Sequence, residues 1–191
     1  LIVPLARSPL LFLLPGALGG AMDFFYLSQR LMPDWTVLGL DYPGISGGAF
    51  HTDIRTLAAA LADHIAHFAG DAPIALGGHS FGGGVAWEVC HELLSRGRTV
   101  ELVLMFDTFC PLGMDGYAEP DQAVYVERLQ RLPTLRALYA ANARIAKNWR
   151  QVSVLPDSVR VVLFKVPDKD PDAMKTATVE DPRDLWADYA A

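Results

Sequence analysis

Residues 78–82 (Gly-His-Ser-Phe-Gly) are the stretch of this sequence best suited to chemistry, because they have the pattern Gly-x-Ser-x-Gly. The apolar run 74–77 before them is typical of a short buried strand, and apolar residues after them recur at helical spacing. A serine on a tight strand-to-helix turn is strained in a way that exposes its hydroxyl, and flanking glycines make room for the neighbouring backbone. We predict that Ser80 is a nucleophile; a glycine-rich turn into an ordinary helix is the alternative.

A serine nucleophile needs an adjacent base, usually histidine, and a carboxylate that orients this base. Asp107 directly follows the apolar run 102–106, the next expected strand. Because parallel strands end at one edge of a sheet, Ser80 and Asp107 should lie at the same edge, one strand apart. Asp107 is therefore the predicted acid. The alternatives are that it only caps the next turn, or that Asp168 or Asp170 serves instead.

Stabilising the oxyanion requires two backbone N–H donors. Phe81 follows the nucleophile and is predicted to supply one of them. The second donor should come from the loop after the first strand, where residues 15–17 (Pro-Gly-Ala) lie, and we assign it to Ala17.

The base is not evident, because none of the five histidines, at positions 51, 64, 67, 79 and 91, follows Asp107. His79 neighbours Ser80, but adjacent side chains on a tight turn point apart. His51 lies on a loop at the expected edge of the sheet and stays an alternative base. His64 and His67 have a spacing that could bind a metal, yet no third ligand stands at an obvious spacing, so we predict no metal site.

The elements that must position these residues alternate along the chain. Apolar runs separated by helical patterns predict a mostly parallel sheet covered by helices, the α/β class, with strands at 10–14, 36–40, 74–77, 102–106 and 161–164. After Asp107 two helical patterns follow each other, at 121–132 and 134–149. We interpret residues 109–150 as a lid insertion within a single domain spanning 1–191.

Composition excludes several classes of function. The net charge of −6, without a basic tract, argues against a nucleic-acid partner, and the apolar runs are too short to span a bilayer. Two cysteines cannot form a disulfide framework, which favours a reducing compartment such as the cytoplasm. Nothing in the sequence indicates a signal peptide or a bound cofactor.

Four segments, 13–20, 38–44, 77–88 and 102–108, occur in an order and spacing similar to the thioesterase domains that terminate nonribosomal peptide and polyketide synthases. The resemblance implies an α/β-hydrolase fold, and it places the acid after the strand that follows the nucleophile, which matches Asp107. It also places the histidine near the C-terminus, after a further strand. We therefore expect the base beyond Ala191, a missing C-terminal strand and helix, and a chain excised from a larger synthase.

The same resemblance implies the substrate and the partner. The substrate would be an acyl, peptidyl or polyketide chain on the phosphopantetheine arm of a carrier protein, which would belong to the same polypeptide. Ser80 would take the acyl group, and water or the chain itself would release it by hydrolysis or cyclisation. Two alternatives remain, an esterase or lipase acting on free esters and a binding domain without catalysis. The basic residues between 127 and 150 are a candidate docking face for an acidic carrier, or simply a solvated helix face.

Overall fold

A single parallel sheet organises the molecule. The computed structural model describes residues 9–32, 34–114, 129, 132–167 and 177–190 of the 191. Five strands of these residues pair in the order β2-β1-β3-β4-β5, and every pair is parallel. Their bounds are β1 Leu10–Leu14, β2 Thr36–Gly39, β3 Ile74–His79, β4 Val100–Phe106 and β5 Arg160–Phe164. The predicted α/β class and parallel sheet are thus confirmed.

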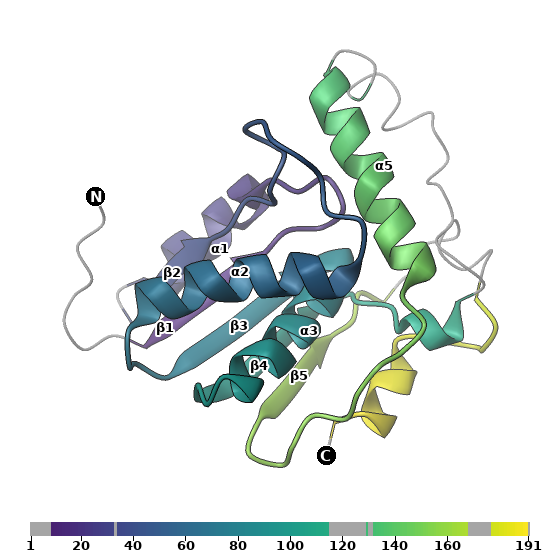
Figure 1. Ribbon diagram of the computed structural model, residues 1–191. Coiled ribbons are helices and arrows are strands. Elements are labelled where there is room, and N and C mark those ends of the chain that lie inside the picture. Colours follow the sequence, from purple (N-terminus) through teal and green to yellow (C-terminus); the bar gives the residue numbers. More distant parts are fainter. Residues whose placement is uncertain (1–8, 33, 115–128, 130–131, 168–176, 191) are drawn as a thin grey trace.

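Helices cover both faces of the sheet. Figure 1 shows α2 and α3 on one face and α1 on the other, while α5 stands beyond the carboxyl ends of the strands. The described helices are α1 Phe25–Leu31, α2 Ile54–Ala69, α3 Phe81–Ser95 and α5 Pro133–Asn148, with 3₁₀ turns η1 Ala21–Phe24, η2 Pro111–Gly113 and η3 Asp184–Asp188. The expected helix at 134–149 is therefore confirmed as α5, whereas the one at 121–132 lies almost entirely outside the described residues.

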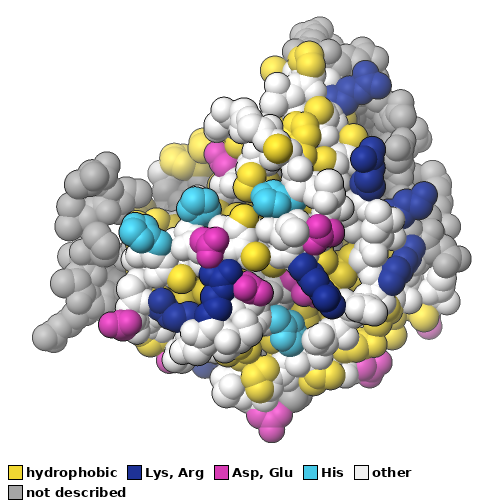
Figure 2. Space-filling view, viewed as in Figure 1, with side chains coloured by type: hydrophobic (Ala, Val, Ile, Leu, Met, Phe, Trp, Pro, Cys, Tyr) yellow, Lys and Arg dark blue, Asp and Glu magenta, His cyan; other side chains and the backbone are white. Residues whose placement is uncertain are grey.

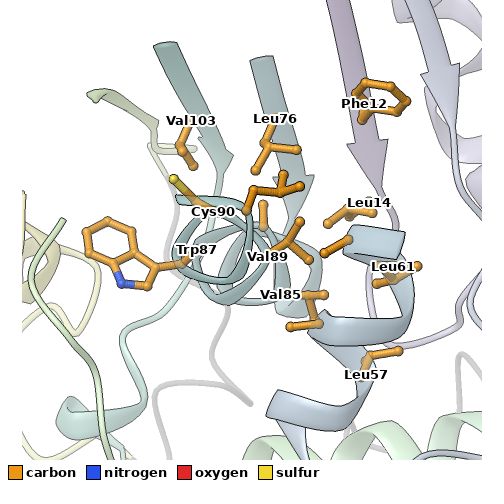
Figure 3. Packing of buried hydrophobic residues seen from close by; sticks show 14 of the residues in the cluster. Phe12, Leu14, Leu57, Leu61, Leu76, Val85, Trp87, Val89, Cys90 and Val103 are labelled. Atoms are coloured by element: carbon orange, nitrogen blue, oxygen red, sulfur yellow. The ribbon is translucent and has the colours of Figure 1, made fainter. Parts of the chain in front are cut away.

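The main core lies between the sheet and helices α2 and α3. Figure 3 shows side chains of α3 pointing at β1, β3 and β4, with Val85, Val89 and Cys90 fully buried. This packing explains why the strands are apolar on both faces, since helices cover each of them. Burial raises the pKa of the Cys90 thiol to about 12, so this cysteine is a core residue and not a reactive one.

The other face of the sheet is covered unevenly. Leu11, Leu13 and Ala75 pack beneath Phe24 and α1 in a small second core. Toward β4 and β5 the cover thins: Phe106 is only half-buried and Phe164 is 50% exposed. Within the described residues, the elements that cover this face lie mainly over β1 and β2.

Candidate active site

The turn between β3 and α3 holds Ser80 in a strained conformation. Its φ of 53° and ψ of −121° lie in a region that side-chain-bearing residues rarely adopt. Two backbone hydrogen bonds hold Ser80 in this conformation. The Ser80 N–H donates to the Phe106 carbonyl at 2.8 Å, and the Ser80 carbonyl accepts from the Gly83 N–H at 3.1 Å. A non-glycine residue held in this way, between a strand and a helix, is the geometry of a nucleophile elbow.

Glycines at positions 78 and 82 are required by close backbone approach. A Cβ on Gly78 would lie 2.1 Å from the Gly82 carbonyl oxygen, and a Cβ on Gly82 would lie 2.2 Å from that of Leu14. Neither contact could be relieved by a side-chain rotation, because both involve backbone atoms. The sequence prediction that these glycines make room for neighbouring backbone is therefore confirmed.

Strand register brings Asp107 beside Ser80. His79 on β3 pairs with Phe106 on β4, so the residues that follow them, Ser80 and Asp107, are neighbours across the two strand ends. Asp107 also has a positive φ, 48°, and its N–H donates to the Phe164 carbonyl at 2.7 Å. The two candidate residues thus share one edge of the sheet on neighbouring strands, as the spacing predicted.

The Asp107 carboxylate is paired with an arginine that the sequence analysis did not single out. Arg183 Nη1 lies 2.5 Å from Asp107 Oδ1, and the Arg183 side chain is 2% exposed. The same guanidinium bonds Asp181 through Nε and Nη2, and this holds the pKa of the Asp181 carboxyl well below its usual range. Arg183 lies in a polar, proline-containing stretch where an exposed loop is the default expectation, so no sequence signal marked it.

The loop that follows β1 lies directly against the elbow. A Cβ built on Gly16 would stand 4.0 Å from Ser80 Cβ, which places the neighbouring residue Ala17 close to the nucleophile. The buried Tyr42 hydroxyl donates to the Pro15 carbonyl at 2.7 Å, and Asn142 Nδ2 donates to the Ala17 carbonyl at 2.9 Å. These bonds fix the loop from two sides.

Phe81 supplies the other candidate oxyanion donor. It is the first residue of α3, so its N–H has no acceptor inside the helix and is available to a developing negative charge. The elements therefore bring Ser80 together with the backbone of Phe81 and with the loop that carries Ala17.

A small cavity of about 40 Å³, partly open to solvent, adjoins Ser80. Its lining is largely apolar and aromatic: Phe81, Gly84, Phe109, Pro111, Met114, Ala146, Trp149 and Arg150 accompany Ser80. Trp149 packs so closely on α3 that a Cβ on Gly84 would lie 2.4 Å from its ring, and its Nε1 donates to Glu88 at 2.9 Å. Arg150 bonds the carbonyls of Pro111 and Met114 and thereby holds η2 at the cavity wall.

No histidine lines this cavity among the described residues. His64 and His67 are exposed on α2, His79 is exposed at the end of β3, and His51 is half-buried. His91 lies on α3 beside the fully buried Trp87, and its Nε2 is 3.0 Å from the Ser153 carbonyl oxygen. Asp168 and Asp170, the reserve acids, lie outside the described residues.

The parallel sheet, its helical layers and the strained serine at the β3–α3 turn define the class of α/β hydrolases. The sequence model of the thioesterase domain matches residues 9–132, well over half of the chain. The chain belongs to the thioesterase domain family. None of its described helices is long and apolar enough to cross a membrane.

Curated relatives are large synthases. The chain is 29% identical over 149 residues to a non-reducing polyketide synthase of Pseudevernia furfuracea, covering 77% of this chain and 7% of that protein. It is 32% identical over 105 residues to an orsellinic acid synthase of Armillaria ostoyae, covering 55% and 5%. The chain thus spans less than a tenth of these relatives, in which the similar region is one part of a much longer polypeptide.

Solved structures share the fold. The NocB thioesterase domain, in a covalent complex with a fluorophosphonate nocardicin G analogue, superposes with a TM-score of 0.73 at 24% identity, covering 98% of this chain and 84% of that one. The RedJ thioesterase from the prodiginine pathway of Streptomyces coelicolor gives 0.74 at 21% identity, covering 100% and 79%. At these identities the likeness establishes the fold.

Proposed function

We propose that this domain releases an acyl chain from the phosphopantetheine arm of a carrier protein through an acyl-serine intermediate. The observation that carries the proposal is the strained Ser80, which opens onto an apolar cavity and has Asp107 beside it on the next strand. The thioesterase family and the synthase relatives support the choice of a thioester as substrate.

In the proposed mechanism, Ser80 Oγ attacks the thioester carbonyl, and its proton passes to a base. The carbonyl oxygen becomes negative, and the N–H groups of Phe81 and Ala17 stabilise it. The C–S bond then breaks, the phosphopantetheine thiol leaves with a proton from the base, and the acyl group stays on Ser80. Water or a nucleophile of the acyl chain itself completes release as an acid or a cyclic product.

We assign the base to a histidine outside these 191 residues, oriented by Asp107. Two features support this assignment: no described histidine lines the Ser80 cavity, and the sheet face near Phe106 and Phe164 is thinly covered. A further strand and helix that carried the histidine would cover this face. His51 stays the alternative base, and its replacement by alanine in the natural polypeptide would separate the two.

We further propose that α5 acts as the lid of the cavity and presents a docking face to the carrier protein. Figure 2 shows dark-blue basic side chains along the α5 side of the molecule. Arg136, Arg144, Lys147 and Arg150 are all exposed, and no acidic residue occurs in α5. On a chain whose net charge is −6, such a face would favour an acidic partner.

The test compares two substrates with matched acyl groups, a carrier-bound thioester and a simple ester such as a p-nitrophenyl ester. The proposal predicts a much higher kcat/KM for the carrier-bound thioester. An enzyme that prefers the free ester would instead be an esterase on the same fold. A chain that turns over neither substrate, with Ser80 unreactive, would be a binding domain.

A further inference from the structure

Among the described residues, Arg183 is the only lysine or arginine that is buried. Removing a guanidinium from water costs several kcal/mol unless its donors are paired. Several contacts offset the cost of burying the Arg183 guanidinium. It donates to the carboxylates of Asp107 and Asp181 and to the Val166 carbonyl, and it lies 5.6 Å from the centre of the Phe109 ring. A cation with this many partners has a fixed position.

Asp181 binds two of the three guanidinium nitrogens of Arg183. Nε and Nη2 of Arg183 donate to its two oxygens at 2.9 and 3.0 Å, the paired geometry that binds a carboxylate most firmly. The Arg183 N–H also donates to Asp181 Oδ1 at 3.1 Å, which closes a tight local unit. The remaining guanidinium nitrogen, Nη1, is thereby directed toward the end of β4.

Asp107 receives a bond on one oxygen only. Nη1 of Arg183 contacts Oδ1, whereas Oδ2 has no hydrogen-bond partner among the residues that the structure describes. Arg183 therefore fixes the Asp107 carboxylate through Oδ1, while Oδ2 stays available to accept another hydrogen bond. Such an arrangement suits an acid that must stay in one orientation and still accept a hydrogen bond from a base.

We propose that Arg183 is a positioning residue for the acyl-transfer reaction: it anchors Asp107 by Oδ1 and leaves Oδ2 to orient the base that activates Ser80. This inference rests on the proposed function, in which Asp107 is the acid. Arg183 does not itself line the cavity, although its guanidinium lies over the ring of Phe109, which does. Its contact with the proposed triad is the bond to Asp107.

The charges around Arg183 set the expected effect on the base. Asp107 and Asp181 contact the guanidinium directly, and Lys165 contacts Asp181 and Asp184 at the end of β5. The base must be neutral to accept the Ser80 proton. The Asp107 carboxylate raises the pKa of such a histidine, and the Arg183 cation opposes that rise.

The experiment measures the rate of Ser80 labelling by a fluorophosphonate probe against pH, using the domain in its natural polypeptide. Arg183→Met removes the cation, so the acid limb of the profile should move up by about one pH unit. Arg183→Lys keeps the charge and should keep the limb near its wild-type position. A residue with a merely structural role would lower the rate without moving the limb.

Asp181→Asn provides a matched control with the opposite sign. It removes a negative charge beside Arg183, so the Arg183 cation lowers the pKa of the base more strongly, and the acid limb of the labelling profile should move to lower pH. The double variant Arg183→Met/Asp181→Asn removes both charges of the pair, so the two opposite shifts should largely cancel, and the limb should lie between those of the single variants. Thermal unfolding identifies the variants that fold.

The inference is overturned if folded Arg183→Met keeps the wild-type limb, or if folded Asp181→Asn does not move the limb to lower pH. That outcome is distinct from failure of the proposed function, in which Ser80→Ala or Asp107→Asn would leave labelling or turnover unchanged.

Discussion

At the scale of single residues, the site depends on backbone conformations that few residues can adopt. Ser80 and Asp107 are the two described non-glycine residues with a positive φ, and they lie side by side on neighbouring strands. Strain of this kind costs on the order of 1–3 kcal/mol per residue and persists only where the surrounding structure enforces it. Its presence at both candidate catalytic positions supports a shared role.

The glycine next to the elbow should be intolerant of any side chain. Gly82→Ala would place a Cβ 2.2 Å from the Leu14 carbonyl oxygen, so the turn or β1 must shift. We expect destabilisation on the order of 3 kcal/mol or more, or failure to fold. Gly20→Ala is the control, because its nearest new contact is an ordinary 3.5 Å to a side chain. Urea unfolding compares the two, and equal stabilities would contradict the close approach.

Asp107→Asn tests the assignment of the acid. The amide keeps the shape of the side chain but removes the charge that orients the base, so turnover should fall by roughly 10⁴-fold. Steady-state kinetics measure this loss, and circular dichroism shows whether the fold is kept. If Asp168→Asn gives the large loss and Asp107→Asn a small one, the acid has been assigned to the wrong strand end.

At the scale of elements, parallel strands explain why much of the site was predictable. Ser80 and Asp107 follow apolar runs that form β3 and β4, and local pattern is enough to place two strand ends at one edge. Asn142 and Arg183 were not predictable in this way. Each lies more than 75 residues from its partner, Ala17 or Asp107, and such contacts depend on tertiary packing that no local pattern encodes.

The basic face of α5 leads to a separate prediction. Arg144→Glu/Lys147→Glu reverses two exposed charges without touching the cavity lining. KM for a carrier-bound thioester should rise several-fold, because steering of an acidic partner weakens, while a free thioester mimic should be unaffected. Steady-state kinetics with both substrates provide the measurement. Equal effects on both substrates would refute docking and leave α5 with an ordinary solvated face.

At the scale of the whole molecule, the Asp181–Arg183–Asp107 cluster connects the C-terminal part of the described chain to the carboxyl end of β4. Arg183 holds the pKa of Asp181 below its usual range. A carboxyl whose pKa is lower in the folded state stabilises the fold above its unfolded pKa, about 4, and loses this contribution as pH falls toward the folded pKa.

This linkage predicts a stability difference that depends on pH. Asp181→Asn should be less stable than wild type by on the order of 2 kcal/mol at neutral pH, and the gap should narrow steadily below about pH 4. Urea unfolding at several pH values measures it. A gap that stays constant down to about pH 2 would mean that the carboxylate charge of Asp181 does not contribute.

The claim that Ser80 is the nucleophile is tested most directly by covalent capture. The domain in its natural polypeptide is treated with a fluorophosphonate probe, and peptide mass mapping locates the adduct. Our account predicts one adduct on Ser80, none in Ser80→Ala, and loss of thioester turnover by about 10⁶-fold in that variant with the fold intact. An adduct on another residue, or a Ser80→Ala variant that keeps more than a few per cent of activity, would contradict it.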